Sequence, residues 1–215
     1  MPKVKESYTE EKKEFILHCT REALKEKPFG QLTMRDVIRK TGFSQGTIYQ
    51  YYKNLDEILN VIICRYMHRM KEEIESCMAR ETEFDRCYEA ICNCMVSLYE
   101  ESPVLFEAVM GEVSYSKENS QEKGLEKDVL YEIYLVGEEL NEIIIRILKR
   151  GMESGIVESG LNLHVAVFYM WSSIGQTILF SSKKKEYIRQ QLGMDDGAYR
   201  KQSFELIIKS IRRFG

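Results

Sequence analysis

The sequence predicts an all-α fold of about nine helices. Only 3 prolines and 13 glycines occur among the 215 residues, so long segments run without the residues that most often interrupt a helix. Apolar residues recur at spacings of three and four along nearly the whole chain, which is the helical period, and no stretch shows the alternation of a half-buried strand. Hydrophobic residues make up 44% of the chain and charged residues 30%, which allows a buried core beneath a charged surface.

The first two helices are bounded by clear signals. Apolar residues follow helical spacing from Phe15 to Leu24, and Pro28 disfavours helix at the residue before it. Thr33 and Asp36 then resemble a capping box at the start of a short second helix. That helix should end at the next glycine, at position 42, because glycine suits the left-handed position after a helix.

The third and fourth helices follow at once. Ser44 is a suitable N-cap for a short third helix, and Asn54 for a longer fourth one. A single apolar stripe marks the fourth helix: Leu55, Ile58, Leu59, Ile62, Tyr66, Met70 and Ile74.

Five more helices are expected in the rest of the chain. Their approximate ranges are 83–100, 103–113, 125–154, 163–182 and 195–213. The polar stretch SYSKENSQEKG (114–124) between two of them predicts a loop.

Composition narrows the function classes. The N-terminal segment is not apolar, so we expect no secretory signal, and the most apolar run, 165–180, is shorter than the roughly 20 residues of a membrane span. A cytoplasmic protein without membrane contact is therefore expected, with its six cysteines reduced and mostly buried. Cys64 and His68 share a helix face but supply only two ligands, so we expect no metal and no cofactor. G-x-S-x-G, P-loop and H-E-x-x-H motifs are missing, which argues against an enzyme.

Charge divides the chain unevenly. Residues 1–55 hold eleven Lys and Arg against seven Asp and Glu, whereas residues 56–215 hold twenty against twenty-seven. A basic head on an acidic body suits nucleic-acid binding, although a solvated mixed-charge surface gives the same count. We expect a DNA-binding domain over 1–55 and a second domain over 56–215.

The stretch from about 33 to 52 predicts a helix-turn-helix. On a helical wheel Ile48 and Tyr52 coincide and can pack on Val37 and Ile38, while the opposite side carries small and polar residues. Two short helices joined at a glycine, the second with a polar outer face, are the arrangement that inserts a helix into the DNA major groove. The alternative is a tight helical hairpin within a bundle.

Residue chemistry assigns roles within this stretch. Gln45 and Gln50 can read adenine edges, Thr47 can meet a thymine methyl, and Gly46 allows close approach to the phosphate chain. The remaining expected DNA-binding residues, largely for phosphates, are Thr33, Arg35, Ser44, Tyr49, Tyr51 and Lys53.

The segment LTMRDVIRKTGFSQGTIYQYYKNLDEIL (32–59) resembles the tetracycline-repressor (TetR) family of bacterial transcription regulators. It contains the family's G-[apolar]-S-x-G-T-[apolar]-Y core, and a weaker similarity covers 151–180. The sequence departs from the family at Leu55, where lysine is usual, and at Gln45, where lysine is frequent. The loss of one phosphate contact should weaken DNA binding and flatten its salt dependence, but it should not abolish binding.

The resemblance implies a homodimer that reads a palindromic operator on double-stranded DNA. Two apolar stripes in the C-terminal helices give a physical reason, because one helical layer would struggle to bury both. The expected dimer residues are Phe168, Trp171, Ile174, Ile178, Phe204, Ile207 and Ile211. The alternative is that both stripes face the core of their own chain.

The resemblance also implies a pocket for a small effector, and the middle helices are rich in soft and aromatic residues that suit an apolar or aromatic molecule. The expected pocket residues are Tyr66, Met67, Met70, Tyr99, Phe106, Met110 and Tyr134. Binding would release a repressor from its operator. Two alternatives stay open, namely a DNA-binding dimer without such an effector, partner-regulated or architectural, and a helical interaction module that does not bind DNA.

Overall fold

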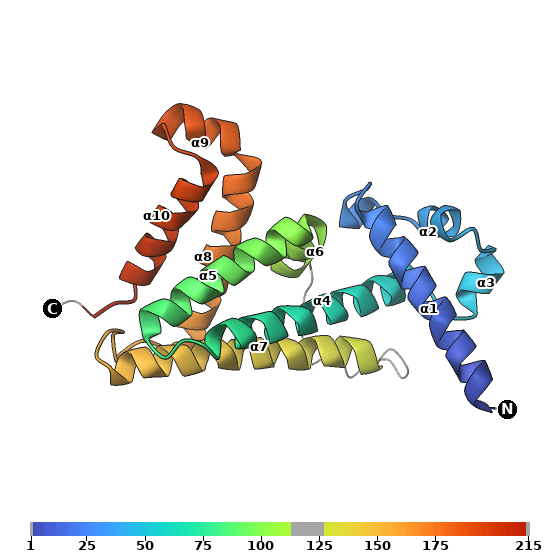
Figure 1. Cartoon of the computed structure of the whole chain (residues 1–215), viewed down its shortest axis with the longest axis horizontal. Helices are drawn as coiled ribbons and strands as arrows, with labels where there is room; N and C mark the ends of the chain where they lie inside the picture. Colours follow the sequence, from blue (N-terminus) through green and yellow to red (C-terminus); the bar gives the residue numbers. More distant parts are fainter. Residues whose placement is uncertain (1, 113–126, 214–215) are drawn as a thin grey trace. The chain divides into compact units, whose positions relative to one another are not determined.

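The computed structural model describes residues 2–112 and 127–213, which form ten α-helices and two shorter helical segments (Figure 1). The bounds are α1 (Pro2–Leu24), η1 (Phe29–Gln31), α2 (Met34–Thr41), α3 (Gln45–Tyr49), α4 (Leu55–Met78), α5 (Phe84–Glu101), α6 (Pro103–Glu107), η2 (Ala108–Glu112), α7 (Lys127–Glu153), α8 (Leu163–Lys183), α9 (Lys185–Leu192) and α10 (Asp196–Lys209). Pairing between extended segments in the described ranges is limited to one isolated bridge, Val157 with Arg212. The predicted all-α class is confirmed.

The chain divides into two compact units. The first comprises Met1–Met67 with Ser114–Tyr134, and the second comprises His68–Val113 with Leu135–Gly215. The division falls within α4 and α7, each of which contributes residues to both units, rather than at the predicted boundary between residues 55 and 56.

The first unit is built around α1, α2, α3 and the first part of α4. Ile16, Val37, Ile48 and Ile58, one from each of these helices, are fully buried and form its apolar centre. The described part of α1 begins at Pro2, well before the apolar stripe that starts at Phe15. Periodicity could not reveal this extension because its residues are mostly polar.

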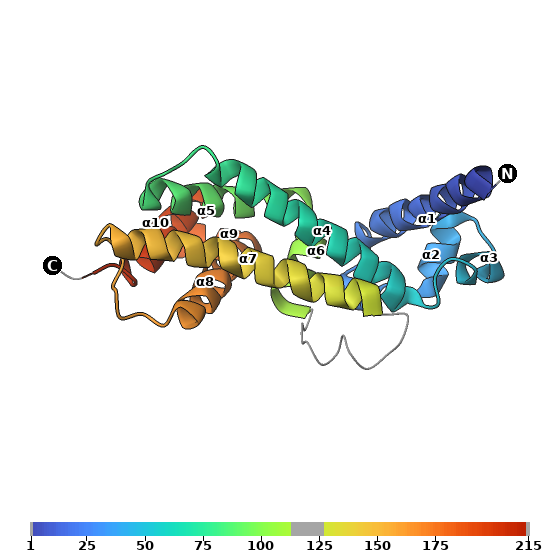
Figure 2. The same ribbon diagram turned by 90° about the horizontal axis from the view of Figure 1, so that it is seen from below.

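The second unit packs α5 and α10 against α8, with α6 on α5. The second half of α4 runs beside α7 in Figure 1 and Figure 2, and Lys71 Nζ on α4 lies 2.7 Å from Glu139 Oε2 on α7. Met95 and Phe106 are fully buried in this unit. Its core therefore draws on helices that are far apart in the sequence.

The structure corrects the predicted helices in two places. One helix was missed, α9, because five of its eight residues are polar and Ile188 is its only buried residue. The sixth predicted helix divides into α6 and the π-helical segment η2. Val113, the predicted loop at 114–124 and the predicted start of the seventh helix at 125 lie outside the described residues.

One of the described helices, α8, is long and apolar enough to cross a membrane by length and composition alone. Ile174 and Ile178 of this helix are buried within the chain. A core helix passes the same test, so the result is weak evidence for a membrane span.

Candidate nucleic-acid interface

The predicted helix-turn-helix forms as expected. Gly42 has a φ of 69°, the left-handed value that glycine adopts without strain, and its N–H donates to the Ile38 carbonyl at 3.0 Å. Ser44 caps α3, because its Oγ accepts a hydrogen bond from the Thr47 backbone N–H at 3.1 Å. Behind α3, Ile48 is fully buried and Tyr52 is 5% exposed. The predicted apolar wedge thus fixes the short helix from one side.

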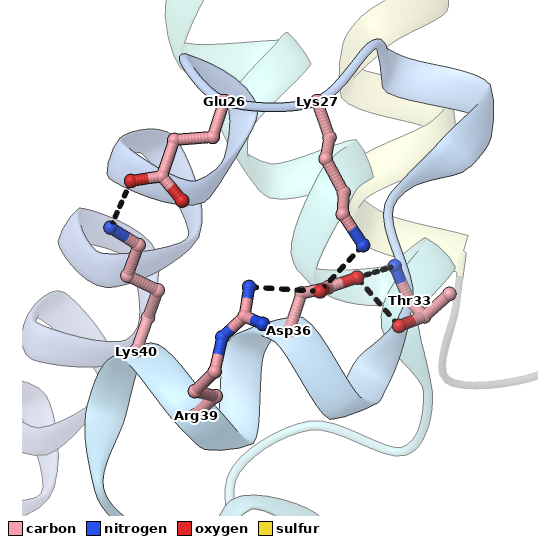
Figure 3. Close-up of polar contacts among 6 residues, drawn as sticks. All are labelled: Glu26, Lys27, Thr33, Asp36, Arg39 and Lys40. Carbon is pink, nitrogen blue, oxygen red and sulfur yellow. Dashed lines mark hydrogen bonds and ion pairs between the residues drawn. The ribbon is translucent and has the colours of Figure 1, made fainter.

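A buried carboxylate ties the start of α2 to the segment that follows α1. Asp36 in the first turn of α2 accepts hydrogen bonds from the Lys27 ammonium at 2.7 Å, from the Thr33 hydroxyl at 2.6 Å and from the Thr33 backbone N–H at 3.0 Å (Figure 3). Arg39 adds a longer contact of 3.2 Å. The predicted pairing of Thr33 with Asp36 is therefore present, and it is joined by a lysine that the sequence did not indicate.

This environment favours the charged form of the carboxyl group. The hydrogen bonds from Lys27 and Thr33 hold the pKa of Asp36 well below its usual range, and they outweigh the opposing effect of burial. A second ion pair, Lys40 Nζ with Glu26 Oε1 at 2.6 Å, links α2 to the segment after α1. Lys27 and Glu26 both follow the last turn of α1, so α2 is held against α1 by charge as well as by apolar packing.

All ten predicted DNA-binding residues lie at the surface of the first unit. Thr47 and Tyr51 are half-buried, and the other eight are exposed: Thr33, Arg35, Ser44, Gln45, Gly46, Tyr49, Gln50 and Lys53. The hydroxyls of Ser44 and Thr47 lie 2.8 Å apart. These hydroxyls therefore organise the start of α3 before any ligand arrives, a role that the residue chemistry alone did not separate from DNA contact.

The start of α4 is also capped. Asn54 Oδ1 accepts the Glu57 backbone N–H at 2.7 Å, and Glu57 Oε2 accepts the Lys53 backbone N–H at 2.5 Å. The Lys53 side chain remains exposed, whereas Leu55, which stands where the family usually has lysine, is half-buried. The backbone of this turn is thus fixed while the Lys53 ammonium stays accessible.

The predicted pocket residues divide between the two units. Tyr66, Met67 and Tyr134 belong to the first unit, and the other four predicted residues belong to the second. Within the second unit the rings of Tyr99 and Phe106 pack edge to face, with their centroids 5.5 Å apart. Tyr66, Met67, Met70 and Phe106 are buried, while Tyr99, Met110 and Tyr134 are half-buried. The assignment of these residues to an effector stays a prediction.

A groove of about 620 Å³ in the second unit contains none of those seven residues. It lies between α5 and α10, and its lining combines apolar residues such as Tyr88 and Ile208 with charged ones such as Glu89 and Arg200. The Tyr88 hydroxyl donates a hydrogen bond to the Phe204 carbonyl at 2.8 Å, which joins the two helices beneath the groove. Sequence periodicity marked these residues only as apolar helix faces, which gave no indication of a groove.

The single chain buries most of the predicted dimer residues, and their place in a dimer stays a prediction. Five of them are already buried within the single chain: Ile174, Ile178, Phe204, Ile207 and Ile211. The two stripes pack inside the second unit, where α8 contacts α10, so the argument that they need a partner chain does not hold. Trp171 is half-buried and its Nε1 donates to Asn141 Oδ1 at 3.1 Å. Phe168 alone is strongly exposed, at 63%.

A different set of apolar residues faces outward on the same two helices. Val165 on α8 is 64% exposed and Leu206 on α10 is 67% exposed, and Tyr169 on α8 is also exposed. Together with Phe168 they form what we call the α8–α10 face. Of the residues that periodicity selected on these two helices, Phe168 faces outward, and the five buried ones face the core of the chain.

Comparisons with known proteins agree with this architecture. The family model for bacterial regulatory proteins of the tetR family matches residues 16–62. An uncharacterized HTH-type transcriptional regulator, YfiR of Bacillus subtilis, is 34% identical over 62 residues, which are 29% of this chain. The matched stretch spans about 30% of that relative's length.

Solved structures are similar over most of the chain. The fatty acid degradation regulator FadR from Bacillus halodurans has a TM-score of 0.68 at 17% identity, covering 94% of this chain and 97% of that one. The transcriptional regulator FadR from Bacillus subtilis, solved in complex with stearoyl-CoA, has a TM-score of 0.65 at 20% identity, covering 92% and 98%. At these identities the likeness concerns the fold.

Fold and interface together define an all-α protein with an N-terminal helix-turn-helix. The segment of residues 16–62 matches the tetR family of bacterial regulatory proteins, and the fold of the chain is similar to that of solved transcription regulators. That description agrees with the expectation that the protein is not an enzyme.

Proposed function

We propose that this protein is a sequence-specific DNA-binding transcriptional regulator, and that it acts as a repressor. The observation that carries the proposal is the exposed polar side of α3, held by a buried wedge of Ile48 and Tyr52 and capped by Ser44. A rigid short helix with exposed amides and hydroxyls can enter the major groove while its buried side keeps its packing. Since the protein acts on DNA, we place it in the cytoplasm.

Roles within the interface follow from side-chain chemistry. Gln45 and Gln50 offer amides that can pair with adenine edges, so they are the residues we propose for sequence reading. Tyr49 is 45% exposed and Lys53 is exposed. We assign these two to the phosphate backbone, where they set the register of the protein on the duplex.

A homodimer would present two such heads to a palindromic operator, with half-sites about one helical turn (roughly 35 Å) apart. The α8–α10 face supports dimerisation, because exposed apolar side chains on two neighbouring helices are costly in water and a symmetric partner would cover them with the same residues. This assignment replaces the buried stripe that the sequence predicted.

We further propose that a small apolar or aromatic effector releases the protein from DNA. The Bacillus subtilis FadR structure holds stearoyl-CoA, which supports a ligand with a long apolar part in a protein of this fold. Tyr99, Phe106 and Met110 provide soft and aromatic surface for such a ligand within the second unit. The ligand can shift the protein away from its DNA-binding state only by as much as it prefers the other state.

Two titrations test the proposal. DNA fragments that the protein selects from a random pool should share a palindrome, and Gln50→Ala should relax the preference for part of each half-site. Stearoyl-CoA, with coenzyme A as its control, should then be added to the complex of protein and selected DNA. Release by the acylated compound alone would support an apolar ligand of this kind, and equal behaviour of the two compounds would contradict it. If the protein selected no sequence from the pool, the proposal that it is a sequence-specific regulator would be contradicted.

A further inference from the structure

A lysine on α1 lies against the turn that leads into α3. The ammonium of Lys12 is 4.8 Å from the centroid of the Phe43 ring and 5.2 Å from the centroid of the Tyr8 ring. Phe43 directly precedes Ser44, the N-cap of α3. Lys12 is therefore far from the helix-turn-helix in sequence and adjacent to it in space, and nothing in the apolar spacing of α1 indicated this.

The position of Phe43 is itself fixed. The centroid of its ring lies 5.3 Å from the centroid of the Phe15 ring on α1. Its backbone N–H donates a hydrogen bond to Thr41 Oγ1 at 3.2 Å. The ring that faces Lys12 is thus held from α1 and from the end of α2. A lysine on such a ring has less conformational freedom than a free one, without the help of a carboxylate.

A lysine that contacts aromatic rings keeps its net charge, whereas a lysine in an ion pair does not. The ring quadrupole attracts the ammonium but carries no net charge, so the full positive charge of Lys12 stays available to an anion. Lys12 forms no ion pair with any residue that the structure describes. Its neighbour Lys13, by contrast, pairs with Glu10 at 3.3 Å.

The same distinction separates the other cations around the motif. Lys27 and Arg39 are paired with Asp36, and Lys40 is paired with Glu26. These three cations share two carboxylates, so most of their charge is already offset within the scaffold. Among the described lysines and arginines of residues 7–55, those that form no ion pair are Lys12, Arg21, Arg35 and Lys53. Arg35 and Lys53 were predicted to bind DNA and Lys12 was not, yet Lys12 lies against Phe43, the residue before the N-cap of α3.

We propose that Lys12 binds a phosphate of the DNA backbone, with Phe43 as the residue that positions it. The proposal rests on the proposed DNA-binding function and adds to it a contact from α1, outside the helix-turn-helix. Lys12 sets register and contributes salt-dependent affinity, and it reads no base. Pre-placement by Phe43 reduces the conformational entropy that a free lysine would lose on binding.

The competing explanation is that Lys12 only joins α1 to the turn and never meets DNA. The two explanations differ in one observable, which is the salt dependence of binding. Removing one phosphate interaction lowers the slope of log K against log salt by about 0.9, so removing one from each head of a dimer lowers it by about 1.8. A purely structural tether would change thermal stability and leave this slope unaltered.

The experiment uses the full chain and a duplex containing its selected binding sequence, titrated at several salt concentrations. Lys12→Met should lower affinity at low salt and flatten the slope, whereas Lys13→Met, one residue away and already ion-paired, should match the unaltered protein. Lys12→Arg should restore both affinity and slope, because it keeps the charge and the contact with the ring. Thermal melts of each variant verify folding.

A second comparison isolates Phe43. Phe43→Leu should weaken binding in the unaltered background but have little further effect in the Lys12→Met background, because its role is to place that lysine. Equal slopes for Lys12→Met and Lys13→Met would overturn the assignment while leaving the DNA-binding function intact. If the unaltered protein bound no DNA at low salt, the proposed function and this contact would both fall.

Discussion

Lys27 Nζ donates a hydrogen bond to Asp36 Oδ1 at 2.7 Å, and this interaction joins the end of α1 to the start of α2. The carboxylate is almost fully buried, at 5% exposure for the residue. A charge in such a place needs partners, and Thr33 supplies two further donors. The scaffold of the helix-turn-helix therefore depends on Asp36 being ionised.

The first prediction concerns pH. Since the pKa of Asp36 is depressed in the folded protein, its stabilising effect is present above its unfolded pKa of about 3.9 and is lost as pH falls through the folded value. The stability difference between the unaltered protein and Asp36→Asn should be largest near neutrality and should shrink below about pH 4. Urea unfolding from pH 7 to 2.5 measures this, and a difference that is independent of pH would contradict it.

A pair of glycines in the motif should respond in opposite ways to alanine. Gly42 has a left-handed φ and open space around it, so Gly42→Ala should cost about 1 kcal/mol through backbone strain alone. Gly46 lies within α3, where a methyl group would have only Ser44 Oγ nearby, at 3.9 Å, so Gly46→Ala should stabilise by up to about 1 kcal/mol. The same change should weaken DNA binding, because the methyl group would stand between α3 and the phosphates. If Gly46→Ala bound DNA as tightly as the unaltered protein or more tightly, the proposed close approach of α3 to the phosphates would be refuted.

Two glycines in the second unit should differ in their tolerance of a side chain. A methyl group at Gly151 would meet Val157 and the ring of Phe84 at less than 3 Å, and neither neighbour can move easily. At Gly175 the obstruction is the sulfur of Met110 at 2.7 Å, which lies near the end of a flexible side chain. Gly151→Ala should therefore cost about 1–3 kcal/mol, and Gly175→Ala distinctly less. Chemical denaturation measures the free energy of unfolding of both variants. Equal losses would contradict the prediction, because they would show that Phe84 and Val157 move aside as easily as Met110.

The α8–α10 face, proposed as the dimer surface, makes a further prediction. Phe168→Ser with Leu206→Ser removes two exposed apolar groups, so it should lower the dimer fraction in analytical ultracentrifugation while the helical content stays the same. Ile178→Ala, on the buried side of α8, should instead cost about 2–5 kcal/mol of stability by leaving a cavity. An undiminished dimer fraction in the double serine variant would place the interface elsewhere.

The sequence predicted helix ends best where a capping residue marks the end. Thr33, Gly42 and Ser44 mark helix ends through local hydrogen bonds and backbone conformation, and all three were predicted correctly. Neither α9 nor the first turns of α1 were predicted, because their mostly polar residues produce no apolar stripe.

Long-range interactions account for the rest. Periodicity finds the apolar side of α8 and α10 but cannot tell whether that side meets its own chain or a partner. Ile174 and Phe204, which were predicted at a dimer interface, are buried within the single chain. The packing of Lys12 on Phe43 and the ion pair of Lys27 with Asp36 join residues on different elements. No local pattern encodes such pairs.

The most direct test of the account is the selection of DNA by the purified protein from a random duplex pool at two salt concentrations. We predict an enriched palindrome, a steep salt slope, and loss of base preference at defined positions when Gln45 or Gln50 is replaced by alanine. A folded protein that retains no DNA at low salt would contradict the account and would favour a helical interaction module instead.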